Sequence, residues 1–194
     1  MKVLLVNGSP HKDGATAAAL TLVEQGVKEQ GLDVEWFQLA NAPVRGCIDC
    51  QGCAKAGRCV FNDDQANELA EAMIAADGII IGTPVYYAAP NGALCALLDR
   101  VFYSRNEFTD DKPFRGKPAA SVSVCWRAGT TSSMDRLNKY FTISEMPVIS
   151  SVYWNNGLLI DEAAGTKEFQ ERIMTTLGTN MAKFLKAVEG KEIV

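Results

Sequence analysis

Short apolar runs alternate along the chain with longer amphipathic stretches, and this alternation constrains the fold more than any other feature. The apolar or alternating runs are typical of strands, and they cover residues 2–7, 33–39, 78–83, 118–126 and 147–154. Apolar residues at helical spacing follow, so we expect helices at 15–30, 65–76, 90–103, 131–143 and 166–188. Because parallel strands need crossover helices, this order predicts an α/β fold with helices on both faces of a parallel sheet.

The size of the chain predicts a single domain. Its 194 residues, of which 47% are hydrophobic, suffice for one well-buried core and are short for two. Two irregular stretches, 41–64 and 104–117, are long for connections in a compact domain, and we expect them to be functional or interface loops. We therefore predict one domain over residues 1–194, with a cysteine-rich loop at 41–64.

Charge and hydropathy argue against two classes of partner. The formal net charge is −4 and the pI is about 5.1, whereas nucleic-acid binders usually carry a basic surface. No apolar run approaches the roughly 18–20 residues of a membrane span, and the first residues lack the apolar core of a signal peptide. We expect a cytoplasmic protein without nucleic-acid or membrane partners.

Three loops should carry the function, because ligands in parallel α/β sheets bind beyond the carboxyl ends of the strands. These loops are 7–16, 83–91 and 126–131. The first joins a strand to a helix whose free N-terminal amides point toward an anion. It lacks the dinucleotide motif G-x-G-x-x-G and the P-loop motif G-x-x-x-x-G-K-[ST], so it predicts a phosphate cradle of another kind. A turn that only caps the helix remains the alternative.

The second loop suits a planar heteroaromatic ring. Pro84 and Pro90 stiffen it, and the adjacent Tyr86 and Tyr87 present aromatic faces beside backbone amides. A flat ring with polar edges is bound by that mixture of π surface and hydrogen-bonding groups. The alternative is that the tyrosines fill an edge of the core.

Four motifs give the chain a resemblance to a known family. They are Ser-Pro-His-x-x-Gly-x-Thr at 9–16, Gly-Thr-Pro-Val-Tyr-Tyr at 82–87, Trp-Arg-Ala-Gly at 126–129, and the cysteines of 47–59 followed by two aspartates at 63–64. The first three resemble the NADPH-dependent FMN reductases of the flavodoxin-like superfamily, and the fourth resembles their iron–sulfur flavoprotein branch. The resemblance covers essentially the whole chain. It implies a flavodoxin-like three-layer sandwich with a five-stranded parallel sheet in the order 2-1-3-4-5.

The resemblance also implies a set of cofactor-binding residues and an assembly. The FMN phosphate would be held by Ser9, His11, Gly14, Ala15 and Thr16. The isoalloxazine ring would be lined by Pro84, Val85, Tyr86, Tyr87 and Asn91. It would be bordered on the other side by Trp126, Arg127, Ala128 and Gly129. Such proteins generally form homodimers or homotetramers with FMN near the subunit interface.

Cys47, Cys50, Cys53 and Cys59 form a compact quartet. In a reducing compartment such a group indicates metal or redox chemistry rather than disulfides. Zinc sites usually use two C-x2-C pairs a dozen or more residues apart, whereas this spacing is closer to a ferredoxin run, with a longer last gap. We predict that the four cysteines bind a [4Fe-4S] cluster, with zinc and unligated thiols as open alternatives.

The remaining reactive residues point to simpler roles. His11 is the only histidine, and the G-x-S-x-G motif is missing, so a Ser-His-Asp hydrolase and a multi-histidine metal site are both disfavoured. Cys95 and Cys125 are expected to be small buried apolar residues. Asp63 and Asp64 are expected to form an acidic pair at a helix N-terminus.

The leading hypothesis is an FMN-dependent oxidoreductase that passes electrons from NAD(P)H through bound FMN to an acceptor. The acceptor would be a flavin, a quinone, an azo compound, a metal ion or a protein electron carrier. Because the cofactor carries the chemistry, no side chain is required as a nucleophile, and we name no catalytic residue. The alternatives are a flavodoxin-like electron-transfer protein or redox sensor, and a zinc-stabilised binding module.

Overall fold

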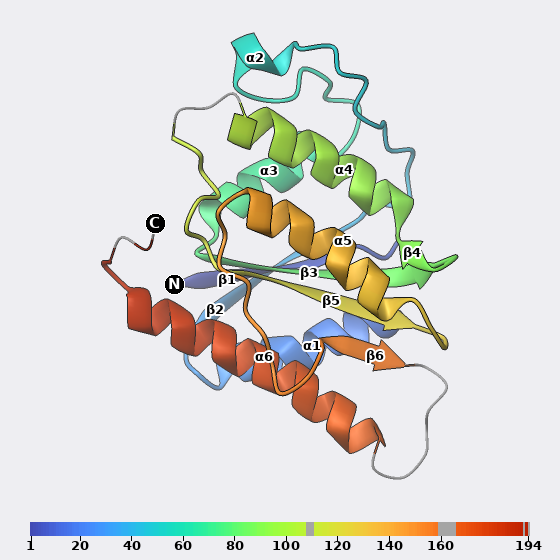
Figure 1. The fold of residues 1–194 in the computed structure, drawn as a ribbon, viewed down its shortest axis with the longest axis vertical. Helices are drawn as coiled ribbons and strands as arrows, with labels where there is room; N and C mark the ends of the chain where they lie inside the picture. The colour runs from blue at the N-terminus through green and yellow to red at the C-terminus, as the bar shows by residue number, and fades with distance from the viewer. Residues whose placement is uncertain (108–110, 159–165, 192, 194) are drawn as a thin grey trace.

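A parallel sheet forms the middle layer of the molecule (Figure 1). The computed structural model describes residues 1–107, 111–158, 166–191 and 193. The strands are β1 (Lys2–Asn7), β2 (Asp33–Gln38), β3 (Gly78–Tyr86), β4 (Ala89–Pro90), β5 (Ala119–Cys125) and β6 (Asn156–Leu158). Their order is β2-β1-β3-β5-β6, all parallel, and the short β4 pairs antiparallel with the end of β3. Apart from β4, this is the flavodoxin-like order that the sequence predicts.

Helices cover both faces of the sheet. They are α1 (Ala15–Lys28), α2 (Cys53–Ala56), α3 (Ala66–Ala75), α4 (Gly92–Phe102), the π-helix η1 (Tyr103–Glu107), α5 (Thr130–Ile143) and α6 (Thr166–Val188). One face packs against α1 and α6, and the other packs against α3, α4 and α5 (Figure 1). Among the helices in the part of the chain that the structure describes, none is long and apolar enough to span a bilayer.

The central strands contribute to two separate cores. Leu4, Ile79 and Ile81 pack with α3, α4 and α5, whereas Leu5 and Ile80 pack with α1 and α6. All five side chains are fully buried. Successive side chains of a strand point to opposite faces, so a strand covered on both sides is apolar along its whole length. This explains why β1 and β3 are continuous apolar runs.

The expected strand at 147–154 is wrong in extent. Val148 makes only an isolated parallel bridge to Ala119, and regular pairing resumes at β6 after a break. Ser151 closes a local turn within the break, since its hydroxyl donates to the carbonyl of Tyr153 at 2.8 Å and accepts from that residue's backbone N–H. Such side-chain bonds compete with a strand ladder. The exposed rings of Tyr153 and Trp154 pack on each other, with centroids 5.1 Å apart, instead of entering the sheet.

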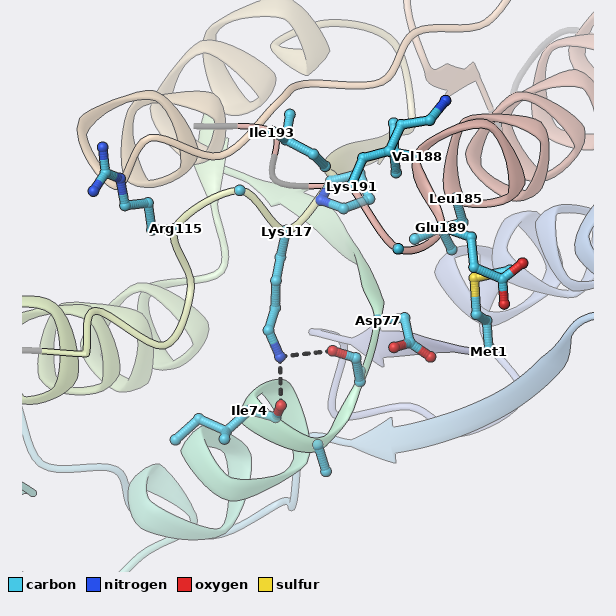
Figure 2. A pocket seen from close by; sticks show the side chains of 15 residues that line it. Met1, Ile74, Asp77, Arg115, Lys117, Leu185, Val188, Glu189, Lys191 and Ile193 are labelled. Carbon is cyan, nitrogen blue, oxygen red and sulfur yellow. Dashed lines mark hydrogen bonds between the residues drawn. The ribbon is translucent and has the colours of Figure 1, made fainter.

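A cavity of about 570 Å³ lies at the edge of the sheet where the strands begin (Figure 2). The Nζ atom of Lys117 donates to the carbonyl oxygens of Ala76, at 2.7 Å, and of Ile74, and so satisfies the C-terminal end of α3. Burial lowers the pKa of Lys117, against the opposing effect of Asp77. This cavity faces away from the carboxyl ends of the strands, where ligands bind in such sheets.

Two glycines allow α1 and α6 to touch through their backbones. A Cβ atom on Gly26 would lie 2.1 Å from the carbonyl oxygen of Thr175, and one on Gly178 would lie 2.0 Å from that of Val23. Each glycine therefore faces the backbone of the other helix. Because the obstructing atoms are backbone, a side chain at either position forces the helices apart.

We expect Gly178→Ala to lower the free energy of unfolding by about 1–3 kcal/mol, the usual cost of overpacking, although alanine is the better helix former. Urea denaturation measures the change. Gly92→Ala is the matched control, since a Cβ at that first residue of α4 meets nothing within 4 Å. If both variants were as stable as the native chain, the close helix contact would be contradicted.

Candidate functional site

Asn91 joins the first two of the loops that lie beyond the carboxyl ends of the strands. Its buried side chain donates from Nδ2 to the carbonyl of Gly8 at 2.8 Å, and its Oδ1 accepts from the Ala93 N–H and so caps α4. Its own N–H donates to Thr83 Oγ1 at 3.0 Å. The Gly8 N–H donates to the Gly82 carbonyl at 2.8 Å. Loops 7–16 and 83–91 are therefore tied together at the base.

Asn7, the last residue of β1, shapes the first loop. Its Oδ1 accepts from the Ser9 N–H at 3.1 Å, and its Nδ2 donates to the carbonyl of His11 at 3.2 Å and to Gln38 Oε1 at 2.7 Å. The Ser9 hydroxyl accepts from the His11 N–H at 3.2 Å. Asn7 was not among the expected site residues. The signal for it was a polar residue directly after four consecutive apolar residues, at the carboxyl end of the strand.

The N-terminus of α1 faces this loop without a side-chain cap. Gly14 occupies the N-cap position in an extended conformation, and the first turn contains no acidic residue. Thr16, in that turn, is 2% exposed, whereas His11 is exposed on the rim. Helix N-termini carry unpaired N–H groups and a positive partial charge, so the place favours an anion.

A pocket of about 330 Å³ lies between the second and third loops. It is lined by Val85, Tyr87, Ala88, Cys125, Trp126, Arg127 and Ala128. Five of these are expected ring contacts, and Ala88 and Cys125 are additions. Pro84 and Tyr86 belong to β3 and do not line the pocket, while Tyr86 pairs with Ala89 in the β3–β4 hairpin.

Strained backbone shapes one wall of this pocket. Tyr87 and Ala88 both have left-handed conformations, with φ of 49° and 63°. The Ser132 hydroxyl donates to the Ala88 carbonyl at 3.1 Å and holds the turn against α5. Gly129 has a φ of 96°, and a Cβ there would lie 2.9 Å from the Val85 side chain. Residues in sparsely populated conformations cluster at functional sites, where surrounding contacts hold them.

The third loop adds an exposed cation and an aromatic ring. The guanidinium of Arg127 lies over the ring of Trp126, 4.9 Å from its centroid. Both residues are exposed at the mouth of the pocket. Cys125 is buried beneath them, and burial raises the pKa of its thiol, which keeps it neutral. Cys95, by contrast, is only half-buried.

The four cysteines of the loop line a second pocket together with the Arg100 side chain. Cys47 and Cys50 are exposed, and Cys53 and Cys59 are buried. Burial raises the pKa of the Cys53 thiol. In the described ranges, no group of three or more His, Cys, Asp or Glu side chains is arranged so that it could hold a metal ion. Within the described residues, the four thiols thus line one pocket without forming such a group.

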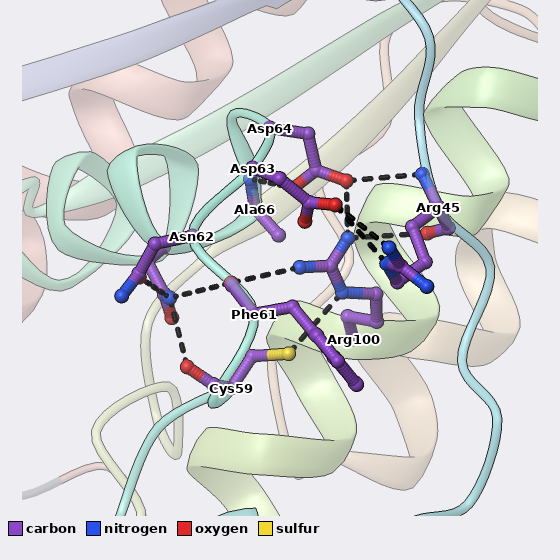
Figure 3. A network of polar contacts seen from close by, with 9 residues as sticks. Arg45, Cys59, Phe61, Asn62, Asp63, Asp64, Ala66 and Arg100 are labelled. Atoms are coloured by element: carbon purple, nitrogen blue, oxygen red, sulfur yellow. Dashed lines mark hydrogen bonds and ion pairs between the residues drawn. The ribbon is translucent and has the colours of Figure 1, made fainter.

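Arg100 of α4 lies buried beneath the cysteine loop (Figure 3). It is 2% exposed, and its Nε–H donates to the Cys59 sulfur at 3.2 Å. Its terminal nitrogens donate to the carbonyls of Arg45 and Phe61, both at 3.1 Å, and to the carboxylate of Asp64. Arg100, like Asn7, was not among the site residues expected from the sequence. Its signal was weak, because Asp99 and Arg100 are adjacent charged residues inside the otherwise apolar helical pattern of 94–102.

The acidic pair is divided between two arginines. Asp63 pairs with Arg45 at the surface, while Asp64 pairs with Arg100 and also accepts the Ala66 N–H at the start of α3. Burial acts to raise the pKa of Asp64, but the hydrogen bonds from Arg100 and from two backbone N–H groups outweigh it and hold that pKa below its usual value.

The π-helix continues the support of the cysteine loop. The Tyr103 hydroxyl accepts from Gln51 Nε2 at 3.0 Å, and Arg105 donates to the carbonyl of Gly57 at 3.0 Å. The aromatic pocket is tied to the first turn of α4 through Asn91, whereas the cysteines contact its end. The eleven residues of α4 span about 16 Å between its two ends.

Comparisons with known proteins agree with this architecture. Residues 1–158 match the family model described as NADPH-dependent FMN reductase. An iron–sulfur flavoprotein of Methanocaldococcus jannaschii is 31% identical over 149 residues, covering 77% of this chain and 76% of that protein. A structure titled flavone reductase superposes with a TM-score of 0.72 at 20% identity, covering 99% of this chain and 65% of the other. A flavodoxin from the domain Archaea gives a TM-score of 0.61 at 19% identity, covering 96% of this chain and 99% of the other.

The sheet order, the helical layers and the structural neighbours define a flavodoxin-like α/β protein. The chain belongs to the NADPH-dependent FMN reductase family of oxidoreductases. The family that the sequence motifs resemble is thereby confirmed, and relatives named iron–sulfur flavoproteins share the larger part of its length.

Proposed function

We propose that this protein is an FMN-dependent oxidoreductase that passes electrons from NAD(P)H through bound FMN to an acceptor. The observation that carries the proposal is the joining of three loops at one edge of the sheet. There an α1 N-terminus without a side-chain cap and an aromatic pocket of about 330 Å³ lie on loops that hydrogen bonds tie together. Bound FMN would supply hydride acceptance and electron transfer, and the protein would position it.

The phosphate of FMN suits the N-terminus of α1. Residues proposed to hold it are Ser9, His11, Gly14, Ala15 and Thr16. The N–H groups at the start of the helix would donate to phosphate oxygens, and the Thr16 hydroxyl lies in the same turn. The Ser9 hydroxyl accepts within the loop and can still donate its proton to a ligand.

The flavin ring suits the aromatic pocket. Residues proposed to contact it are Val85, Tyr87, Ala88, Cys125, Trp126, Arg127 and Ala128. Pro84, Tyr86 and Gly129 would shape the loops around it. Asn91 is proposed to act by positioning, because both ends of its side chain already bond to the protein. The Arg127 guanidinium would place positive charge beside the ring or beside a nicotinamide phosphate.

The partners follow from the same chemistry. We propose NADH or NADPH as the donor, and a flavin, quinone, azo compound, metal ion or electron-carrier protein as the acceptor. The exposed mouth of the pocket at Tyr87 and Trp126 gives such molecules access to the ring. We also propose a homodimer or homotetramer that works in the cytoplasm, where cysteine thiols stay reduced.

The cysteine quartet is proposed to bind a [4Fe-4S] cluster. Four cysteine sulfurs are the usual ligands of such clusters, they line one pocket, and relatives of this chain are named iron–sulfur flavoproteins. Cluster binding would draw Cys47 and Cys50 inward from the surface. Metal sites commonly complete their folding in this way, because metal binding is coupled to folding of the segment that carries the ligands.

A second candidate function is an electron-transfer protein or redox sensor with little turnover of its own. The observation that favours it is the second pocket, which is lined by four thiols and by Arg100 of α4, the helix that follows loop 83–91. Such a protein would exchange electrons with a protein partner faster than with a nicotinamide donor.

Thr16→Val should raise the Kd for FMN about tenfold or more, because a hydrogen bond to a charged group contributes roughly 1.5–3 kcal/mol. Riboflavin, which lacks the phosphate, should bind the native and variant proteins equally. Quenching of flavin fluorescence measures both. Thr21→Val, further along α1 where the hydroxyl donates to Ala17, is the control. Unchanged FMN affinity in Thr16→Val would contradict the phosphate assignment.

The FMN-loaded protein should oxidise NADPH or NADH under anaerobic conditions when excess FMN is added as acceptor. The fall in nicotinamide absorbance measures the rate, and protein without flavin serves as the control. Undetectable turnover in the flavin-loaded protein would overturn the oxidoreductase proposal and favour the electron carrier.

Anaerobically purified protein should contain about four irons and four acid-labile sulfides per chain. Cys50→Ser should lose most of this iron, because it removes a proposed ligand. Cys95→Ser, at a half-buried cysteine outside the loop, should retain it. Bound zinc without iron would favour the zinc-stabilised binding module. If the protein contains neither metal, the cysteines are unligated thiols.

A further inference from the structure

Arg100 is a buried cation, and its hydrogen-bond partners indicate its role. It lies on α4 among fully buried apolar neighbours, including Leu97 and Val101. Taking a guanidinium out of water is costly unless the charge is paired and its donors are all used. Its partners therefore indicate what the residue does.

All of these partners belong to the cysteine loop or its flanks (Figure 3). The carbonyl of Arg45 lies before the first cysteine, whereas Cys59, Phe61 and Asp64 lie at and after the last one. One rigid guanidinium thus joins the two ends of the loop to α4. The Nε–H is directed at a sulfur atom, which as a neutral thiol is a weak acceptor and as a metal-bound thiolate is a better one.

We propose that Arg100 is the positioning residue of the cysteine centre. It fixes the Cys59 sulfur against α4, and it donates an N–H···S hydrogen bond to that sulfur when a cluster is bound. The second half of this inference rests on the proposed [4Fe-4S] cluster, and the first half holds for the metal-free protein as well.

The charges around Cys59 predict two opposite effects on the cluster. A cluster with four thiolate ligands gains negative charge on reduction, so a hydrogen bond to sulfur and a nearby cation stabilise the reduced form and raise the reduction potential. The Asp64 carboxylate offsets part of the charge of Arg100. Removing the arginine should therefore lower the potential, and removing the carboxylate should raise it.

The test is an anaerobic redox titration of the FMN- and iron-loaded protein, followed by EPR. Arg100→Gln should shift the cluster to a more negative potential, and Asp64→Asn should shift it to a more positive one. Arg45→Gln and Asp63→Asn are the matched controls, because that neighbouring ion pair is exposed (42% and 55%) and screened by solvent. Shifts of the same sign in both Arg100→Gln and Asp64→Asn, or shifts no larger than in the controls, would overturn the electronic role.

Arg100→Lys separates charge from geometry if the glutamine variant folds poorly. Lysine keeps the charge but cannot direct a fixed Nε–H at the sulfur while also holding two carbonyls and a carboxylate. The reduction potential of the cluster in Arg100→Lys should lie between the potentials in the native protein and in Arg100→Gln. If the cluster in Arg100→Lys had the same reduction potential as in the native protein, the N–H···S hydrogen bond would be contradicted.

Hydrogen exchange in the metal-free protein tests the anchoring alone. Backbone amides of residues 45–64 should exchange faster in Arg100→Gln than in Arg45→Gln, with the sheet unchanged in both. Equal exchange would overturn the anchoring role. If the native protein takes up no iron, the cluster proposal and the electronic role fail together, and exchange still decides whether Arg100 holds the loop.

Discussion

Parallel pairing of the central strands is the constraint on which the rest of this structure depends. Side chains from β1 and β3 enter both cores, so helices must cover both faces of the sheet. The crossover helices then place every strand-to-helix loop at one edge. Close approach of α1 and α6 through Gly26 and Gly178 completes one layer. The candidate flavin loops meet because the strands that carry them are parallel neighbours.

Helix α4 connects the two chemical features of the molecule. Its N-cap residue, Asn91, ties together the loops at the carboxyl edge of the sheet, and Arg100 near its other end holds the cysteine loop. Both residues are buried polar groups with several partners, which makes their geometry specific. The candidate flavin pocket and the cysteine pocket have no lining residue in common, so they are distinct sites in one chain.

Sequence patterns predict the regular part of the fold well, because burial on both faces leaves a direct signature. The helix expected at 166–188 coincides with α6, and the apolar run at 78–83 lies within β3. The strand expected at 147–154 failed for a local reason. Its aromatic residues have high strand propensity, but the Ser151 turn and contacts among exposed rings remove them from the sheet. Strand propensity alone does not predict when side-chain hydrogen bonds of this kind will displace a strand.

By itself, the sequence determined the α/β class, the three candidate ligand loops and the family, because these depend on periodicity and on motifs of neighbouring residues. Only the tertiary structure decided which side chains share a pocket and which hold the loops in place. Asn7, Asn91 and Arg100 bond to groups far from them in sequence or around a loop, and no local pattern encodes such partners. The cysteine quartet shows the same division, since its spacing is local but its anchor to α4 arises from the packed fold.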